Sequence, residues 1–261
     1  MLDFMARTAV FRVEEVAAFS RLRPAALKGL LRYHVDAGHL LRVRRGLYAA
    51  VPRGTRPNAA SPDPFLIASR MTGDAVLAFH TALAFHGRAY STRQVFTVWS
   101  AAQVRLFEFR GEQFRAVVPG GEGATRSRRM KAGVTEAERQ GLRLRVTSLE
   151  RTLVEVLDRP DLAGGWEEVW RSLEMVEFFD LDEVIACVRL LQNATTAARV
   201  GFYLEQHARS LQVDEAHLRA LRRLRPAQPR YMDRRRGGKW MPAWNLIVPE
   251  AVLDRSWEEP S

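Results

Sequence analysis

A helix followed at once by a hairpin is the feature that most constrains the fold of this chain. Proline fits the first turn of a helix and glycine fits the position just past its end, which predicts a helix over Pro24–Ala37 with Gly38 after it. Two strand-like runs follow, His39–Val43 and Leu47–Val51, joined by Arg44-Arg45-Gly46. The glycine of that loop can supply the left-handed residue of a three-residue hairpin.

The predicted helix has one apolar face and one small, basic face. Leu27, Leu30, Leu31 and Val35 recur at the spacing of a single face, opposite alanine, glycine and cationic residues. Small residues allow close approach to a major groove, and long cations can reach bases or phosphates. The candidate DNA contacts in the helix and hairpin are Arg23, Lys28, Arg32, Arg42, Arg44 and Arg45.

Two shorter helices are expected upstream, one near Leu2, Met5 and Ala6 and one over Val13–Phe19. Three helices followed by a hairpin with a basic tip predict a winged helix-turn-helix, whose wing touches the phosphate backbone or the minor groove. We place this domain at residues 1–55 and call it the head. The alternative is a winged helix used only for protein contacts, and the cationic wing tip counts against it.

The positive charge is arranged in blocks along the chain. The 261 residues carry a formal charge of +10. Residues 1–60 hold 11 Arg and Lys against 4 acidic residues, residues 148–185 hold 3 against 11, and residues 209–239 hold 10 against 3. A general preference for arginine would not alternate in this way. We therefore expect a basic head, an acidic middle and a basic tail with different partners or on different faces of the molecule.

Several classes of protein are disfavoured by the sequence. The N-terminus has Asp3 and no long apolar run, so we expect a cytoplasmic protein without a signal peptide or a membrane-spanning helix. The lone Cys187 excludes an internal disulfide and a multi-cysteine zinc site. His80 and His86 are six residues apart and do not share a helix face, and no phosphate-binding loop or serine elbow is present. We expect no enzyme activity, no metal and no cofactor.

The rest of the chain predicts an α+β fold, in which the head precedes a larger mixed domain with a helical C-terminal part. A Pro- and Gly-rich stretch from Val51 to Pro64 indicates a linker, so this domain is placed at residues 64–250. Thr147 and Glu150 have the spacing of a capping box. Helices are expected at 65–71, 76–85, 148–157, 166–175, 181–191, 195–211 and 214–224, and strands at 95–99, 105–109, 113–118 and 142–146.

Four strings, in this order, resemble the AbiEi family, the antitoxin halves of type IV toxin–antitoxin systems first associated with abortive phage infection. They are Leu40–Tyr48, Phe79–Gly87, Val146–Val154, and Arg159-Pro160 with Gly164-Gly165. The chain departs from the family in having Phe79 where Ser is frequent and Glu155 where Asp is frequent. A polar site built around position 79 would therefore be weakened here.

The resemblance implies a protein with two functions. The winged helix would bind inverted repeats in duplex DNA at its own promoter and repress the operon, and the larger domain would counteract a nucleotidyltransferase-like toxin, without requiring direct contact. The alternatives are a plain winged-helix regulator with a sensory or protein-interaction domain, and an enzyme carried on a winged helix. A gene for a nucleotidyltransferase directly downstream would favour the antitoxin.

Overall fold

The computed structural model describes residues 1–233 and 237–257, so the arginines at 234–236 of the basic tail lie outside the described residues. The chain divides into two compact units, and each unit is assembled from separate segments. Unit 1 comprises Met1–Leu77, Arg93–Gly120 and Thr135–Val146, and unit 2 comprises Ala78–Thr92, Gly121–Val134 and Thr147–Ser261. The predicted α+β class is confirmed, and the predicted linker lies within unit 1.

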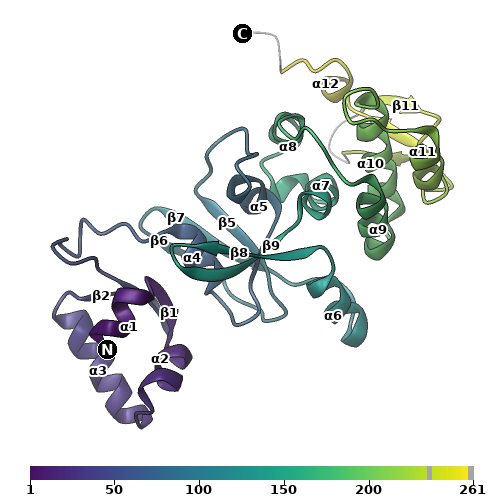
Figure 1. Cartoon of the computed structure of the whole chain (residues 1–261). Helices are drawn as coiled ribbons and strands as arrows, with labels where there is room; N and C mark the ends of the chain where they lie inside the picture. The colour runs from purple at the N-terminus through teal and green to yellow at the C-terminus, as the bar shows by residue number, and fades with distance from the viewer. Residues whose placement is uncertain (234–236, 258–261) are drawn as a thin grey trace. The chain divides into compact units, whose positions relative to one another are not determined.

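The head has three helices and a three-stranded sheet (Figure 1). Its elements are α1 (Leu2–Arg7), β1 (Val10–Arg12), α2 (Val13–Ser20), α3 (Pro24–Asp36), β2 (Leu40–Arg44) and β3 (Leu47–Ala50). The strand order is β1-β3-β2, and both pairings are antiparallel. The helices and the hairpin lie where the sequence predicted them, and β1 is an additional strand that the sequence analysis missed because it has only three residues.

A small apolar core holds the head together. Phe11 on β1 is fully buried and stacks on Tyr48 of β3, while Phe4 of α1 contacts the edge of the Phe11 ring. Leu27 and Leu31 bring α3 onto this core. Leu30 and Val35, which were expected to face inward beside them, are only half-buried, and the third buried residue of α3 is His34.

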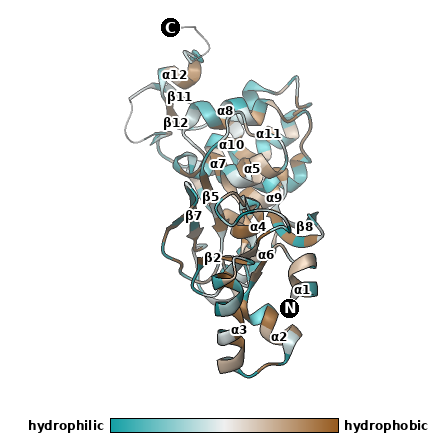
Figure 2. Cartoon of the chain, turned by 90° about the vertical axis from the view of Figure 1, so that its left-hand side faces the viewer, coloured by the Kyte–Doolittle hydropathy of each residue, from teal (hydrophilic) through white to brown (hydrophobic). Residues whose placement is uncertain are grey.

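The remainder of unit 1 is a six-stranded sheet in the order β6-β7-β5-β4-β9-β8. The β5–β7 and β4–β9 pairs are parallel, whereas β4–β5 and β6–β7 are antiparallel. Apolar residues follow its central strands (Figure 2), and the helix α4 (Pro64–Ser69) packs on β4 and β5. The strands are β4 (Val76–Leu77), β5 (Val95–Trp99), β6 (Phe107–Phe109), β7 (Glu112–Val117), β8 (Val134–Arg139) and β9 (Leu142–Thr147).

Unit 2 is built mainly from helices that pack around α7 (Leu149–Asp158), whose residues 151–157 are all buried. Its first helix, α5, contacts α7 although more than 60 residues separate them in the chain. The other helices are α5 (Phe79–Phe85), α6 (Gly123–Lys131), the 3-10 helix η1 (Pro160–Leu162), α8 (Trp166–Glu174), α9 (Leu181–Leu191), α10 (Ala194–Gln206), α11 (Glu215–Arg222) and α12 (Glu250–Leu253).

A three-stranded sheet completes unit 2, with β12 (Leu246–Val248) between β10 (Arg230–Tyr231) and β11 (Lys239–Met241). The β10–β12 pair is parallel and the β11–β12 pair antiparallel. The buried Trp244 precedes β12 and packs against Gly201 of α10, where a Cβ atom would lie 2.1 Å from the indole ring. Glycine at 201 is thus required for α10 and this indole to meet.

Three local predictions for the chain after the head were wrong, and other elements were missed. Val76 and Leu77 form a strand and not the start of a helix, because they pair with β5 and β9. Helix α7 is capped by Ser148, whose hydroxyl accepts from the Arg151 N–H at 3.2 Å, and Thr147 ends β9. Helix α10 stops at Gln206 and not at residue 211. The strongly basic α6 and the half-buried β8 were missed because neither has an apolar periodicity.

Candidate nucleic-acid interface

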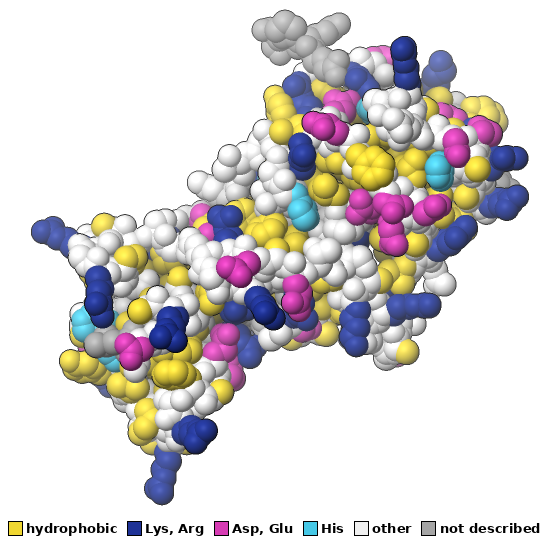
Figure 3. Space-filling model, viewed as in Figure 1, with side chains coloured by type: hydrophobic (Ala, Val, Ile, Leu, Met, Phe, Trp, Pro, Cys, Tyr) yellow, Lys and Arg dark blue, Asp and Glu magenta, His cyan; other side chains and the backbone are white. Residues whose placement is uncertain are grey.

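Helix α3 presents its cationic face to solvent because its apolar face is fixed in the core of the head. Pro24 occupies the first turn after Arg23, and Leu27, Leu31 and His34 are buried. Arg23, Lys28 and Arg32 are exposed on the opposite side, together with the small residues Ala25 and Gly29. Lys and Arg side chains project from the head in Figure 3.

The cation Arg32 of α3 makes only a weak, exposed ion pair within the head. Arg32 lies 3.6 Å from Asp36, and both side chains are more than two-thirds exposed. An ion pair as exposed as this contributes little to stability, so a stronger anion can displace Asp36. Arg32 can therefore turn toward a phosphate or a base edge.

The wing carries two exposed arginines. Arg42 lies on β2 and Arg45 in the turn that joins β2 to β3. The turn has two residues, Arg45 and Gly46, and not the expected three, because Arg44 pairs with Leu47. The register shifts between Arg42 and Arg44, so β2 has a bulge there. Gly46 has the predicted left-handed conformation, with φ of 80°.

Arg44 is placed differently from the other candidates. Its Nη2 donates to the Met71 carbonyl at 2.9 Å, and its guanidinium lies 5.2 Å from the centre of the Phe107 ring. Burial lowers the pKa of Arg44 from its ordinary value. Five of the six candidates are thus exposed on α3 and the wing: Arg23, Lys28, Arg32, Arg42 and Arg45. Arg44 instead connects the wing to the rest of unit 1.

The buried His34 of α3 and the exposed His39, which follows the helix, form a pair that the sequence pattern did not reveal. The Nδ1 atoms of His34 and His39 are 3.2 Å apart, so one ring donates to the other. Burial lowers the pKa of His34, and the nearby charges of His39 and the N-terminus lower it further. The folded head therefore favours the neutral form of His34 more than the unfolded chain does.

We expect the head to lose stability in mild acid. The pKa of His34 is lower in the folded chain than in the unfolded chain, so stability falls as the pH drops below about 6.5, the ordinary value for histidine. Amide hydrogen exchange of residues 1–51 at about pH 7.5 and about pH 5.5 measures this. A His34→Gln variant should show a smaller difference between the two pH values. If the unchanged chain and the His34→Gln variant differ equally between the two pH values, His34 is not the cause of the lost stability.

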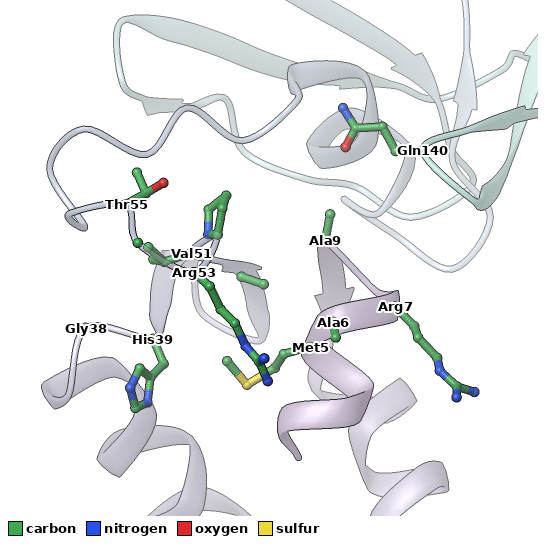
Figure 4. A pocket seen from close by; sticks show the side chains of 13 residues that line it. Met5, Ala6, Arg7, Ala9, Gly38, His39, Val51, Arg53, Thr55 and Gln140 are labelled. Carbon is green, nitrogen blue, oxygen red and sulfur yellow. The ribbon is translucent and has the colours of Figure 1, made fainter.

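An open groove lies on the head beside α1 and the ends of β2 and β3 (Figure 4). It encloses about 860 Å³, and its lining includes Arg7, His39, Arg53 and Gln140. The lining residues come from four separate segments of the chain, so no local sequence pattern predicts this groove. The five exposed cations of α3 and the wing do not line it.

Unit 2 contains a buried polar cluster centred on Glu168 of α8. Its carboxylate lies 3.1 Å from His80 Nε2 and accepts from the backbone N–H of Ser91 at 3.0 Å, the Ser91 hydroxyl at 2.6 Å and the Ser172 hydroxyl at 3.1 Å. Burial acts to raise the pKa of Glu168, but the hydrogen bonds from Ser91 and the charge of His80 outweigh it, so the pKa is lowered. This cluster joins α5 and the loop after it to α8.

Phe79, noted above as a departure from the family, is buried at the start of α5 with φ of 54°. A left-handed conformation is strained for a bulky residue, so the packing of unit 2 must hold it there. Glu155, the other departure, is buried and ion-paired with Arg151 at 2.6 Å. Cys187 is buried, and burial raises its pKa to about 11.

Metal binding and membrane insertion were considered for the residues that the structure describes. Within residues 1–233 and 237–257, no cluster of three or more His, Cys, Asp or Glu side chains is arranged to hold a metal ion. In the same part of the chain, no helix has the length and apolar character needed to cross a membrane.

The fold is similar to that of a solved mycobacterial protein. The crystal structure of the RV2827C protein from Mycobacterium tuberculosis superimposes with a TM-score of 0.60 at 20% sequence identity, covering 98% of this chain and 92% of the other. At this identity the similarity concerns the fold. No curated protein sequence gives a significant match. Residues 1–51 match the model of the family described as "Transcriptional regulator, AbiEi antitoxin". The resemblance to AbiEi antitoxins is thus confirmed for the segment that forms the winged head.

Proposed function

We propose that this chain is an antitoxin that binds duplex DNA at its own promoter through α3 and the β2–β3 wing. The observation that carries the proposal is the set of five exposed cations, Arg23, Lys28, Arg32, Arg42 and Arg45, on a head that matches a family of transcriptional regulators. Arg44 is left out of the proposed contacts because its guanidinium is held by Met71 and Phe107.

The dimensions of α3 suit a major groove. The helix has 13 residues and is therefore roughly 20 Å long, and its small residues Ala25 and Gly29 permit close approach. In this arrangement Arg23, Lys28 and Arg32 reach base edges or phosphates. Arg42 and Arg45 contact the backbone beside the groove. Two copies on inverted repeats would occlude the promoter and repress the operon.

The antitoxin part of the proposal concerns residues 64–250. It rests on the resemblance of the Phe79–Gly87 and Val146–Val154 strings to AbiEi antitoxins and on the family match of the head. The toxin counteracted would be nucleotidyltransferase-like. A plain regulator shares the same head, so only the effect on a toxin separates the two functions.

Removing the wing cations should weaken DNA binding and make it less sensitive to salt. Each lost phosphate contact lowers the slope of log affinity against log salt by about 0.9, so Arg42→Ala with Arg45→Ala should lower it by about 1.8. Fluorescence anisotropy on the promoter duplex at several salt concentrations measures the slope.

The matched control replaces Arg128 and Arg143, two exposed arginines outside the head, with alanine. It removes the same charge from the protein and should leave the slope close to that of the unchanged chain. Equal slopes for the wing variant and this control would reject the wing contacts.

A further inference from the structure

The groove beside α1 is lined by basic side chains and by no acidic one. Arg7, His39 and Arg53 are the only ionisable residues among the thirteen that line it, and all three are exposed. Gln140, on the opposite edge, donates to the carboxylate of Asp63 at 3.2 Å. That carboxylate is itself buried in an ion pair, so it does not offset the cations. The groove therefore attracts anions.

A tight turn holds Arg53 at the edge of the groove. The Thr55 N–H donates to the Pro52 carbonyl at 3.0 Å, and Gly54 has φ of 80°. A closed four-residue turn with a left-handed glycine in its third position is typical of type II. Arg53 is the second residue of this turn, so its backbone is fixed. Its side chain reaches into the groove in Figure 4.

His39 connects the groove to α3. Its Nδ1 atom is paired with that of His34 at 3.2 Å, and its Nε2 atom takes no part in this pair. A neutral imidazole that carries its proton on Nε2 can only accept at Nδ1, so His34 is then the donor of the pair. Because His34 is a buried residue of α3, an occupant that accepts from His39 Nε2 also fixes the tautomer of a side chain in the core of that helix.

The rest of the lining is largely apolar. Met5, Val51 and Pro52 contribute hydrocarbon surface, and Arg7 stands at the end of α1 with its side chain directed outward in Figure 4. The volume of about 860 Å³ lies within the range of about 300–1,000 Å³ that is typical of small-molecule sites. A ligand that matches this lining carries both an anionic group and an apolar body.

We propose that the groove binds a small organic anion, an aryl or alkyl group that carries a phosphate or a carboxylate. The guanidinium of Arg53 donates two hydrogen bonds to the anionic group, and His39 Nε2 donates a third. Met5 and Val51 contact the apolar body. The site is separate from the five exposed cations of α3 and the wing, and it does not depend on the proposed operator binding.

The test follows the isotope-labelled full chain by NMR during titration with phenyl phosphate. Inorganic phosphate and phenol, the two halves of this probe, are titrated in parallel. The amide signals of His39 and of Arg53–Thr55 should shift and saturate at a lower concentration of phenyl phosphate than of either half. A titration with benzoate identifies the preferred group, since the tighter of the two aryl anions shows whether the site is built for a phosphate or a carboxylate.

Arg53→Ala should weaken the binding of phenyl phosphate about tenfold or more, because it removes charged hydrogen-bond donors. Arg53→Lys keeps the charge and should retain part of the affinity. The matched control is Arg56→Ala, which removes an exposed arginine that does not line the groove and should leave the affinity unchanged.

Three results would overturn the proposal. The first is equal weakening by Arg53→Ala and Arg56→Ala, and the second is binding of inorganic phosphate as tight as that of phenyl phosphate. The third is displacement of phenyl phosphate by excess duplex DNA, which would assign these cations to the DNA contact. A chain that binds phenyl phosphate but no promoter DNA would support the groove and count only against the proposed operator binding.

Discussion

Replacing Arg23, Lys28 and Arg32 together with alanine should lower affinity for the promoter duplex at least about 100-fold. Each base contact of the bidentate kind is worth about 1–3 kcal/mol, and the three side chains share the exposed face of α3. The wing would still hold phosphates, so binding to unrelated duplex DNA should fall less. Anisotropy titrations with promoter and scrambled duplexes at one salt concentration give the ratio of the two affinities, which measures the preference for the promoter.

A matched triple variant controls for the lost charge. Arg7, Arg53 and Arg56 are exposed cations of unit 1 that lie outside α3 and the wing. Their replacement by alanine removes the same three charges and should leave the preference for the promoter intact. If this triple variant lowers the preference as much as the α3 variant does, α3 is not the base-reading element.

Glu168→Ala should destabilise unit 2 by about 3–5 kcal/mol. Glu168 is 7% exposed, and its removal leaves His80, Ser91 and Ser172 without their shared acceptor inside the fold. Chemical denaturation followed by circular dichroism measures the change. The adjacent Glu167 makes an exposed ion pair with Arg171, so Glu167→Ala should cost less than about 1 kcal/mol. Equal costs for the two variants would contradict the role assigned to the buried cluster.

The lowered pKa of the Glu168 carboxylate also predicts that the stability of unit 2 depends on pH. The pKa of Glu168 is lower in the folded chain than in the unfolded chain. Its contribution to the free energy of unfolding is therefore fully present above its ordinary pKa of about 4.3, and this contribution is lost as the pH falls through the lower folded value. The Glu168→Ala variant should lose less stability than the unchanged chain in that acid range.

The sequence predicted the head well because its signals are local. Pro24 is favoured in the first turn of a helix, and Gly38 and Gly46 have left-handed conformations that few other residues accept, so the three residues bound α3 and the hairpin. The direction of Arg44 was not predictable, since Met71 and Phe107 lie 27 and 63 residues further along the chain. Local pattern locates a wing, but it does not say which arginine of the wing turns inward.

The chain after the head shows where local sequence pattern fails to predict the fold. The run around Val76 and Leu77 is as apolar as a buried helix, and only its pairing with β5 and β9 makes it a strand. The carboxylate of Glu168 is brought to His80 by a contact across 88 residues. Tyr231 and Trp240 likewise lie on one sheet face only because β10 and β11 pair with β12, which no spacing in the sequence revealed.

In the proposed function, one chain both represses its promoter through the head and neutralises a toxin through the rest. The most direct test measures growth during expression of the neighbouring gene, in cells that also carry a reporter behind the chain's own promoter. The unchanged chain, supplied from a separate promoter, should silence the reporter and restore growth. The α3 triple variant should leave the reporter active and still restore growth. A chain that silences the reporter but never restores growth would contradict the antitoxin assignment and leave a plain regulator.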